Sequence, residues 1–225
     1  MQVDTHIHSS YSRESPPHRC NPRLILRTAR RVGLDGICIS DHDTIDGYLT
    51  AKRIRRDDDP LVIPACEVST SRGHLLAIGV EESWEKGVDP LDVVDLCREE
   101  GGIVAAPHPF YLSTISVSWL ARDLELAVEV FNAMASILVY PNLAAEKLAS
   151  KYGLPRTAGS DAHSYELVGL GRTVADADDE DDFISEVRRG RVEIRGSRPK
   201  LGYAVRFALN SLLSRLDRVI SGRGT

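Results

Sequence analysis

Short runs of apolar, mostly β-branched residues alternate along this chain with helix-length amphipathic stretches. The short runs are typical of buried strands, and the amphipathic stretches are typical of helices that cover a core. Their alternation predicts βα units around a parallel sheet. The expected strands are residues 3–7, 36–40, 61–68, 74–79, 102–106, 127–131, 156–158, 172–174 and 192–195. The expected helices are residues 22–32, 45–56, 90–100, 141–152, 180–189 and 201–220.

The number of these units predicts the architecture. Seven or eight βα units within 225 residues indicate a small closed barrel of the α/β class. No linker rich in Pro, Gly or Ser divides the chain, so we expect one barrel domain over residues 1–195. Residues 196–225 are then expected to form a basic C-terminal helix that packs on the barrel or extends from it.

Composition narrows the class of protein. The chain is 42% hydrophobic and 27% charged, which is ordinary for a globular protein and excludes a disordered one. Its net charge of −5 argues against wholesale binding to duplex nucleic acid. No apolar run is long enough to span a membrane, and no leader peptide is evident. The four cysteines lack CxxC spacing, as is typical of free thiols in a reducing compartment, so a cytoplasmic location is expected.

Charge is unevenly distributed at the C-terminal end. Six of the seven residues 176–182 are acidic, which favours a solvated turn that leads into a helix. Residues 195–225 carry seven basic residues and one acidic residue, a net charge of +6. This basic segment is either a solvated helix face or an arm that attracts phosphate groups.

Histidines and carboxylates gather at the ends of the expected strands. In a βα-barrel the strand ends meet at one rim, where active sites lie. Imidazoles and carboxylates crowded there are costly to bury without a cation, so a divalent metal site is expected. The histidines are His6, His8, His42, His74, His108 and His163, and their acidic neighbours are Asp4, Asp41, Asp43, Glu67 and Asp161. The seventh histidine, His18, lies in a polar loop and is expected to be away from the rim.

Each motif taken alone also has a plain structural interpretation. The His6-x-His8 pair fits an edge strand with two exposed histidines, and Asp43 fits a helix cap. His74 precedes four apolar residues and fits a hydrogen-bonded core histidine. Their joint occurrence at strand ends is what favours metal binding.

Taken in order, the segments DTHIHSSYS, SDHDT, PACEVST, GHLLAIG, APHP and GSDAH resemble the PHP family, named for polymerase and histidinol phosphatase. The resemblance extends over roughly residues 3–175. It implies a distorted (β/α)7 TIM-like barrel that holds two or three divalent ions, Zn, Mn or Fe. It also implies an enzyme that hydrolyses phosphoesters.

The resemblance further implies three metal positions. The first resembles a set made of His6, His8, Glu67 and Asp161. The second shares Glu67 and adds His74 and His108. The third resembles His42 and His163 together with one residue from the loop after the first strand. Relatives carry Asp, Glu or His in that loop, and Glu14 is the residue here that can serve, because Arg13 has the wrong charge.

The expected chemistry is attack on phosphorus by metal-bound hydroxide. A site with several divalent ions lowers the pKa of bound water, clamps phosphate oxygens and stabilises the leaving oxygen. The chain has no P-loop and no G-x-S-x-G elbow that would supply another mechanism. His42 or Asp43 is the candidate proton donor to the leaving group. Arg13 and Arg172 are the candidates for binding phosphate, and Arg19 is a weaker one.

Neighbouring polar residues are expected to support these groups. Asp4, Asp41 and Asp43 are candidates for orienting imidazoles, and Asn132 ends a strand at the same rim. The expected substrate is a small phosphorylated metabolite or nucleotide, with a nucleic-acid end as a possible substrate and no membrane partner. Two alternatives stay open: a metal-dependent amidohydrolase, and a non-catalytic barrel subunit of a nucleic-acid-processing assembly.

Overall fold

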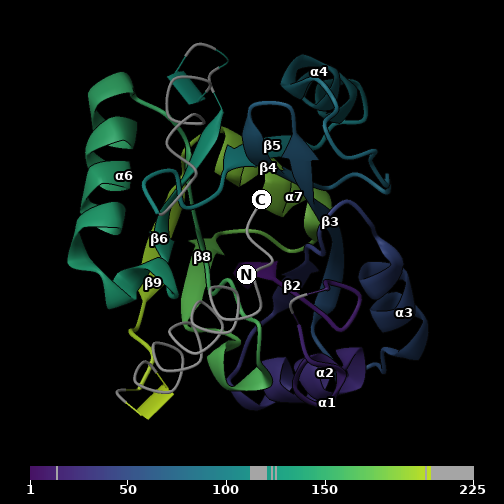
Figure 1. The fold of residues 1–225 in the computed structure, drawn as a ribbon. Coiled ribbons are helices and arrows are strands. Elements are labelled where there is room, and N and C mark those ends of the chain that lie inside the picture. The colour runs from purple at the N-terminus through teal and green to yellow at the C-terminus, as the bar shows by residue number, and fades with distance from the viewer. Residues whose placement is uncertain (14, 112–120, 123, 125, 201, 204–225) are drawn as a thin grey trace, which may run out of the picture.

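A barrel of strands surrounded by helices forms the body of the protein. The computed structural model describes residues 1–225 apart from 14, 112–120, 123, 125, 201 and 204–225. Figure 1 looks into the ring of strands, with α2, α3, α4 and α6 arranged around it. The described strands are β1 (Gln2–Ile7), β2 (Gly36–Ile39), β3 (Leu61–Thr70), β4 (Gly73–Ile78), β5 (Ile103–Ala106), β6 (Ala127–Asn132), β7 (Arg156–Gly159), β8 (Gly171–Ala175) and β9 (Val192–Gly196).

Six α-helices and two 3-10 turns connect the strands within the described residues. The helices are α1 (Pro17–Cys20), α2 (Pro22–Arg31), α3 (Asp46–Ile54), α4 (Pro90–Glu99), α6 (Val139–Tyr152) and α7 (Glu180–Arg188), with 3-10 turns η1 (Ala135–Ile137) and η2 (Tyr165–Leu167). Asn21 accepts a hydrogen bond from the backbone amide of Arg23 and so caps α2, and Asp89 caps α4 in the same way. The helix expected over 201–220 lies outside the described residues, except for 202–203.

The sheet closes almost completely, which confirms the expected TIM-like barrel. Its strand order is β7-β6-β5-β4-β3-β2-β1-β8-β9. Side chains join β7 to β1 and β8, because the hydroxyls of Thr5 and Thr173 both donate to the carbonyl of Ala158. Gly171 approaches Gly159 so closely that a Cβ on it would lie 2.1 Å from the carbonyl oxygen. Only glycine fits at this position, where β8 approaches β7.

The strands are not all parallel, and here the expectation from sequence was wrong. β4 is antiparallel to both β3 and β5, and β8 is antiparallel to β1 and β9. Two residues, Ser71 and Arg72, join β3 to β4. A parallel pair needs a crossover of a dozen residues or more, so this connection permits only a hairpin. The hairpin places the end of β3 and the start of β4 at the same rim.

One end of the barrel is filled by apolar side chains. Phe183, Ile184 and Val187 of α7 pack against residues near the starts of parallel strands, such as Val3 and Ile103. The acidic run feeds this helix, because Asp179 caps it by accepting a hydrogen bond from Asp182. α7 therefore covers the amino ends of the parallel strands and leaves their carboxyl ends for other contacts.

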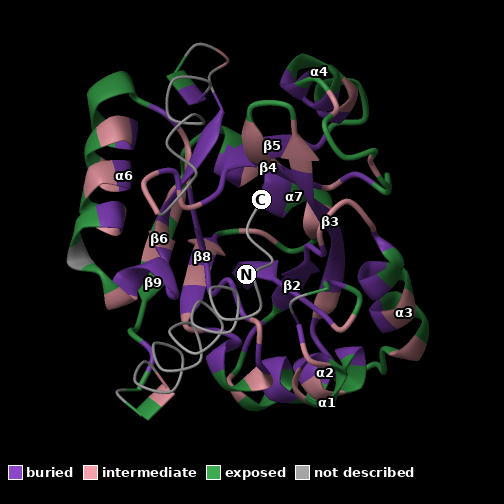
Figure 2. Cartoon of the chain, viewed as in Figure 1, coloured by how far each residue is buried: buried purple, intermediate pink, exposed green. Residues whose placement is uncertain are grey.

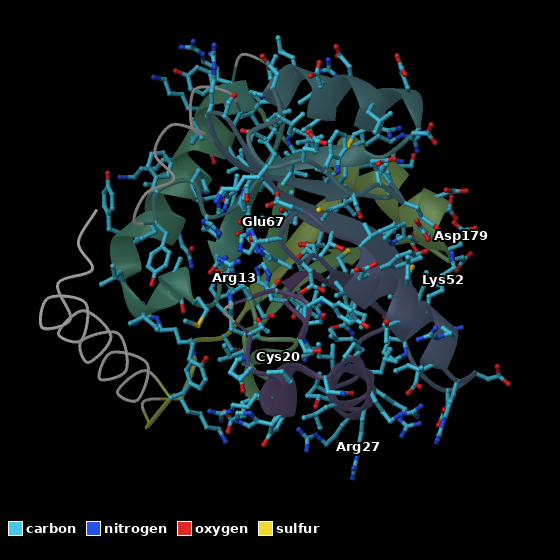
Figure 3. All side chains as sticks on the ribbon, turned by 45° about the vertical axis from the view of Figure 1, so that its right-hand side comes forward. Arg13, Cys20, Arg27, Lys52, Glu67 and Asp179 are labelled. Atoms are coloured by element: carbon cyan, nitrogen blue, oxygen red, sulfur yellow. The ribbon has the colours of Figure 1, made fainter. Side chains whose placement is uncertain are left out.

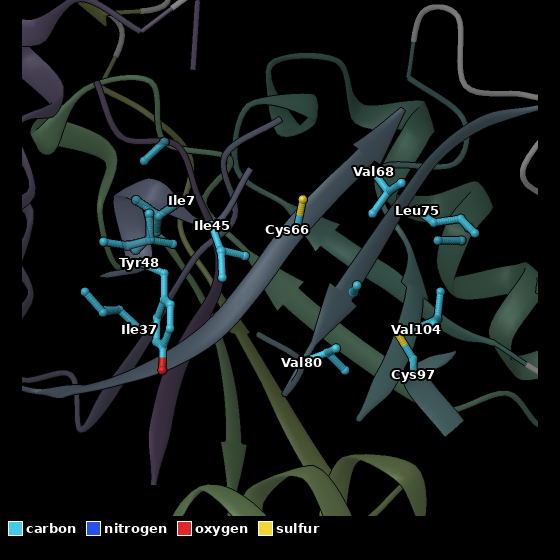
Figure 4. Packing of buried hydrophobic residues seen from close by; sticks show 14 of the residues in the cluster. Ile7, Ile37, Ile45, Tyr48, Cys66, Val68, Leu75, Val80, Cys97 and Val104 are labelled. Carbon is cyan, nitrogen blue, oxygen red and sulfur yellow. The ribbon is translucent and has the colours of Figure 1, made fainter. Parts of the chain in front are cut away.

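A second apolar layer lies between the strands and the outer helices. Figure 4 shows part of it, in which Tyr48 of α3 packs near Ile37 and Cys97 of α4 lies near Val104. Most strands are largely buried in Figure 2, whereas β9 and the outer helix faces are partly exposed. All four cysteines are buried free thiols, as expected. In the part of the chain that the structure describes, every helix is too short or too polar to cross a bilayer.

Candidate metal centre

The carboxyl ends of the strands carry the histidines and acidic residues singled out in the sequence. Backbone contacts continue the strand pairing beyond the strands themselves and hold these residues in place. The amide of Asp161 donates to the carbonyl of His6 over 2.8 Å, and the amide of His8 donates to Ala162 over 3.0 Å. On the other side, the amide of Glu67 donates to Asp41 over 3.2 Å. Three separate loops are thereby fixed against one another at a single rim.

Glu67 lies at the centre of the cluster and is buried, and Figure 3 labels it near the middle of the view. Its Oε2 is 3.3 Å from His6 Nε2, 3.1 Å from His8 Nε2 and 3.5 Å from His42 Nε2. Its Oε1 is 2.9 Å from His74 Nδ1 and 3.4 Å from His108 Nε2. One buried carboxylate therefore faces five imidazole nitrogens.

Asp161 provides the second carboxylate. Its Oδ1 lies 3.4 Å from His8 Nε2, 3.5 Å from His163 Nδ1 and 3.7 Å from His6 Nε2. Its Oδ2 is 4.0 Å from His108 Nε2. The six histidines expected at the rim are thus brought together by two carboxylates. Four overlapping ligand groups result, namely His6–His8–Glu67, His6–His108–Asp161, His8–Asp161–His163 and His42–Glu67–His74.

The donor set fits divalent cations. Imidazole nitrogens and carboxylate oxygens are the usual ligands of Zn and of similar transition metals. The Nε2 atoms of His6 and His8 lie only 3.1 Å apart, and both face Glu67. A cation shared between these nitrogens and oxygens resolves that crowding without leaving a lone pair unmatched.

The pKa values show how the cluster is balanced electrostatically. Burial raises the pKa of Glu67, but the charge on His6 and hydrogen bonds from His108 hold it well below its usual value. Asp161 behaves in the same way: burial raises its pKa, and the charge on His6 outweighs that effect. Burial lowers the pKa of His6, while the surrounding carboxylates, Glu129 first, raise it well above normal. The buried carboxylates stay ionised and attract positive charge, which a bound cation supplies as well as a proton.

Backbone strain is concentrated at the same rim. Among the described residues, the non-glycine residues with positive φ are Asp43 at 60°, His108 at 29° and Asp161 at 53°. Residues other than glycine avoid this region unless the surrounding structure enforces it. All three belong to the strand-end turns that carry the cluster.

Glu129 of β6 was not identified in the sequence, yet it contacts the cluster directly. It is fully buried, and its Oε1 lies 3.1 Å from His6 Nδ1. Its Oε2 accepts hydrogen bonds from the amide of His108 over 2.8 Å and from the side chain of Asn132 over 2.9 Å. Asn132 also donates to Asp161 over 3.3 Å, so it faces the rim as expected. The only trace in the sequence was one acidic residue inside the apolar run AVEVFN.

The aspartates expected to orient imidazoles accept hydrogen bonds from backbone amides and serine hydroxyls, and Asp41 reaches His8 through Ser12. Asp4 accepts hydrogen bonds from the amides of Ser160 and Gly169, and burial raises its pKa to about 6 despite these bonds. Asp43 accepts the amide of Ser69 over 2.6 Å. Asp41 accepts four hydrogen bonds from Ser9 and Ser12, and Ser12 in turn contacts His8.

The candidate phosphate-binding arginines are placed differently from one another. Arg13 is exposed on the loop after β1. Arg172 is not brought to the cluster, because its guanidinium donates to the carbonyls of Gly169 and Val32. Arg19 forms an ion pair with Glu166. His18 is exposed on α1, and Glu14 lies outside the described residues.

Comparisons with known proteins agree with this geometry. The family model described as PHP-associated matches residues 139–192. The chain is 31% identical to the uncharacterized protein MJ1587 of Methanocaldococcus jannaschii over 166 residues, which are 70% of this chain and 96% of that protein.

Two solved structures illustrate the shared fold. A two-domain protein from Bacteroides vulgatus, which contains a predicted PHP-like metal-dependent phosphoesterase, superimposes with a TM-score of 0.68 at 16% identity. That superposition covers 87% of this chain, whereas the chain spans 64% of the length of that protein. The lesion-specific endonuclease PfuEndoQ from Pyrococcus furiosus gives a TM-score of 0.58 at 16% identity, over 92% of this chain and 66% of the endonuclease.

Proposed function

Because this chain belongs to the PHP domain family, we propose that it is a metal-dependent hydrolase of phosphoesters. One observation carries the proposal: the carboxylate of Glu67 lies within 3.5 Å of five imidazole nitrogens. Clusters of this kind are assembled for multinuclear metal sites, since buried charge on this scale is otherwise costly. The reaction proposed is hydrolysis of a phosphate ester, with a small metabolite or nucleotide as the first candidate substrate.

We assign three sets of ligands, of which the first two share Glu67. The first set is His6, His8, Glu67 and Asp161, and the second is Glu67, His74 and His108. The third is His42 and His163, which flank His8 with ring centroids 4.9 and 4.4 Å away, together with Glu14. When bound there, divalent ions of Zn, Mn or Fe would activate water and neutralise the charge of the phosphate.

The side chains also define the direction of substrate entry. His6, His8 and Glu67 are almost fully buried, whereas the side chains of His42, His163 and His74 are 25%, 26% and 37% exposed. The substrate therefore approaches from the side of the exposed histidines. Arg13 is exposed and forms no ion pair with any described residue, so we assign it to the phosphate group. We assign protonation of the leaving oxygen to His42 or the adjacent Asp43, whose turn lies on this side.

A nucleic-acid end is the second candidate substrate, and a row of arginines on α2 favours it. Arg23, Arg27 and Arg31 are exposed, recur every four residues and form no ion pair within the described part of the chain. Four residues of helix advance by ~6 Å, so the row presents a line of positive charge to a phosphate backbone. PfuEndoQ, similar in fold, acts as a lesion-specific endonuclease.

The test combines metal content with substrate class. Protein purified without chelator should contain more than one equivalent of transition metal by elemental analysis. With added Mn it should hydrolyse aryl phosphomonoesters or diesters faster than aryl amides. Faster amide hydrolysis would assign the chain to the amidohydrolases, and the absence of metal and of turnover would support a non-catalytic barrel. Charge reversal of the three α2 arginines should weaken oligonucleotide binding and flatten its salt dependence, while aryl phosphate turnover stays unchanged.

A further inference from the structure

We propose that Ser12 is a positioning residue that relays the negative charge of Asp41 to His8 and thereby selects the imidazole tautomer able to bind metal. The relay extends the proposed metal site by two residues that touch neither substrate nor metal. The role of these hydrogen bonds in metal binding rests on the proposed function. The hydrogen bonds themselves form between protein groups and can be measured in metal-free protein.

The direction of each hydrogen bond follows from the chemistry of its partners. Asp41 is fully buried and receives two backbone amides, from Ser9 over 2.7 Å and from Ser12 over 3.1 Å. It also receives both serine hydroxyls, that of Ser9 over 2.5 Å and that of Ser12 over 2.7 Å. A carboxylate with four donors around it acts only as an acceptor. The single proton of the Ser12 hydroxyl is therefore committed to Asp41.

The hydroxyl oxygen of Ser12 is left as an acceptor. His8 Nδ1 lies 3.0 Å from it, so this ring nitrogen must carry the proton of the contact. In a neutral imidazole, the other nitrogen then carries the lone pair. That nitrogen, Nε2, is the one that faces Glu67 Oε2 at 3.1 Å and Asp161 Oδ1 at 3.4 Å. The relay therefore directs the metal-binding lone pair into the cluster.

The hydrogen bonds from His8 to Ser12 and from Ser12 to Asp41 disfavour the other tautomer of His8, in which the proton is on Nε2. Two carboxylate oxygens near Nε2 would attract a proton to that nitrogen, and an Nε2–H imidazole cannot bind a cation there. Asp41 supplies negative charge on the opposite side of the ring, through one hydroxyl, and so favours the proton on Nδ1. His6 is served differently, because Glu129 contacts its Nδ1 directly over 3.1 Å. His6 at the end of β1 and His8 just after it are thus oriented by two different contacts.

Helix α3 holds the relay in place from outside the cluster. A Cβ added to Gly47 would lie 1.9 Å from Asp41 Oδ2 and 2.4 Å from Ser9 Oγ. No side chain fits that position while Asp41 keeps its present place. The Ser12 hydroxyl also accepts the backbone amide of His42 over 3.2 Å, so the relay joins the loop after β1 to the turn after β2.

The decisive measurement is the tautomer of His8 in metal-free protein labelled with 15N in histidine, read from long-range 15N–1H correlation spectra. In the wild type His8 should be protonated on Nδ1. Ser12→Ala should move the proton toward Nε2, and Ser12→Thr, which keeps the hydroxyl, should restore the wild-type signal. Ser9→Ala is the matched control, because it removes one bond to Asp41 without touching His8.

A second readout is the affinity for Zn, measured against a chromophoric chelator. Ser12→Ala should weaken it by ~10–100-fold, as is usual when a partner of a ligating histidine is lost. Gly47→Ala should weaken it in the same direction, whereas Leu49→Ala, exposed on the same helix, should not. An unchanged His8 tautomer in Ser12→Ala, or an equal change in Ser9→Ala, overturns the proposal. Because the spectra need neither metal nor substrate, that failure is distinct from a failure of the phosphoesterase assignment.

Discussion

The two ends of the barrel differ completely in what they bury. At the amino ends of the parallel strands, α7 inserts Phe183, Ile184 and Val187 among apolar side chains. At the carboxyl ends, two carboxylates and six imidazoles occupy the corresponding place. The apolar end gains free energy from burial, whereas the ionisable end gains it only when its charges are balanced. The residues that stabilise the fold and the residues of the proposed site therefore lie at opposite ends of the barrel, as in other βα-barrels.

The strongest test of this difference between the two ends is a substitution at the ionisable end alone. Glu67→Gln removes the charge that faces five imidazoles, so turnover should fall about 1,000-fold, equivalent to ~4 kcal/mol. The fold should persist, but the melting temperature in chelator should fall, because the ionised Glu67 carboxylate contributes stability to the metal-free protein. His18→Ala, on the exposed helix α1, is the matched histidine control and should leave rate and metal content unchanged. A large loss of turnover in that control would place His18 at the site.

The reciprocal change weakens the apolar end. Phe183 is fully buried, and Phe183→Ala should cost about 3–5 kcal/mol of unfolding free energy, measured by urea titration. Turnover per folded molecule should stay at the wild-type level, since the residue lies at the far end of the strands. A tenfold drop in that turnover would mean that the two ends are coupled.

A smaller effect distinguishes the metal-free from the metal-loaded ionisable end. The raised pKa of His6 contributes stability below its unfolded value of 6.5, and this contribution is lost as pH rises through the folded pKa. The lowered pKa of Glu67 contributes stability above its unfolded value of 4.5, and this contribution is lost as pH falls through the folded pKa. Both contributions are complete only between pH 4.5 and 6.5.

Melting temperatures should therefore peak in that window when the protein is kept in chelator. Metal-loaded protein should instead gain stability above pH 6.5, because a cation replaces the proton on the ligating nitrogens. Identical pH profiles with and without chelator would show that no metal binds at the cluster.

Most of the fold followed from local pattern, and the exceptions have physical causes. Short apolar runs bounded by turn residues predicted each described strand, because the strands of βα units are buried and therefore almost continuously apolar. The antiparallel direction of β4 could have been predicted, because the five residues between the two expected strands, like the two residues found, are too few for a parallel crossover. The strand direction of β8 depends on how the barrel closes, and this involves residues distant in sequence such as Ala158 and Thr173.

The histidines and carboxylates were foreseeable because they lie directly at strand ends in recognisable motifs. Glu129 and Ser12 were missed for opposite reasons. Glu129 lies inside a buried strand, where sequence position indicates core and not function. Ser12 is an ordinary loop serine whose role arises only when Asp41, distant in sequence, is brought within 2.7 Å. A residue that acts through another residue leaves no pattern of its own.

The positive φ angles at Asp43 and Asp161 also bear on how this chain can change over evolutionary time. Aspartate and asparagine tolerate that backbone region better than most residues, and glycine tolerates it best. A descendant that no longer needs a ligand at position 161 therefore has few folded routes open to it, chiefly Asn or Gly. Barrels that no longer catalyse hydrolysis should then be recognisable from these two positions, where Asp, Asn or Gly is retained because the backbone conformation requires it.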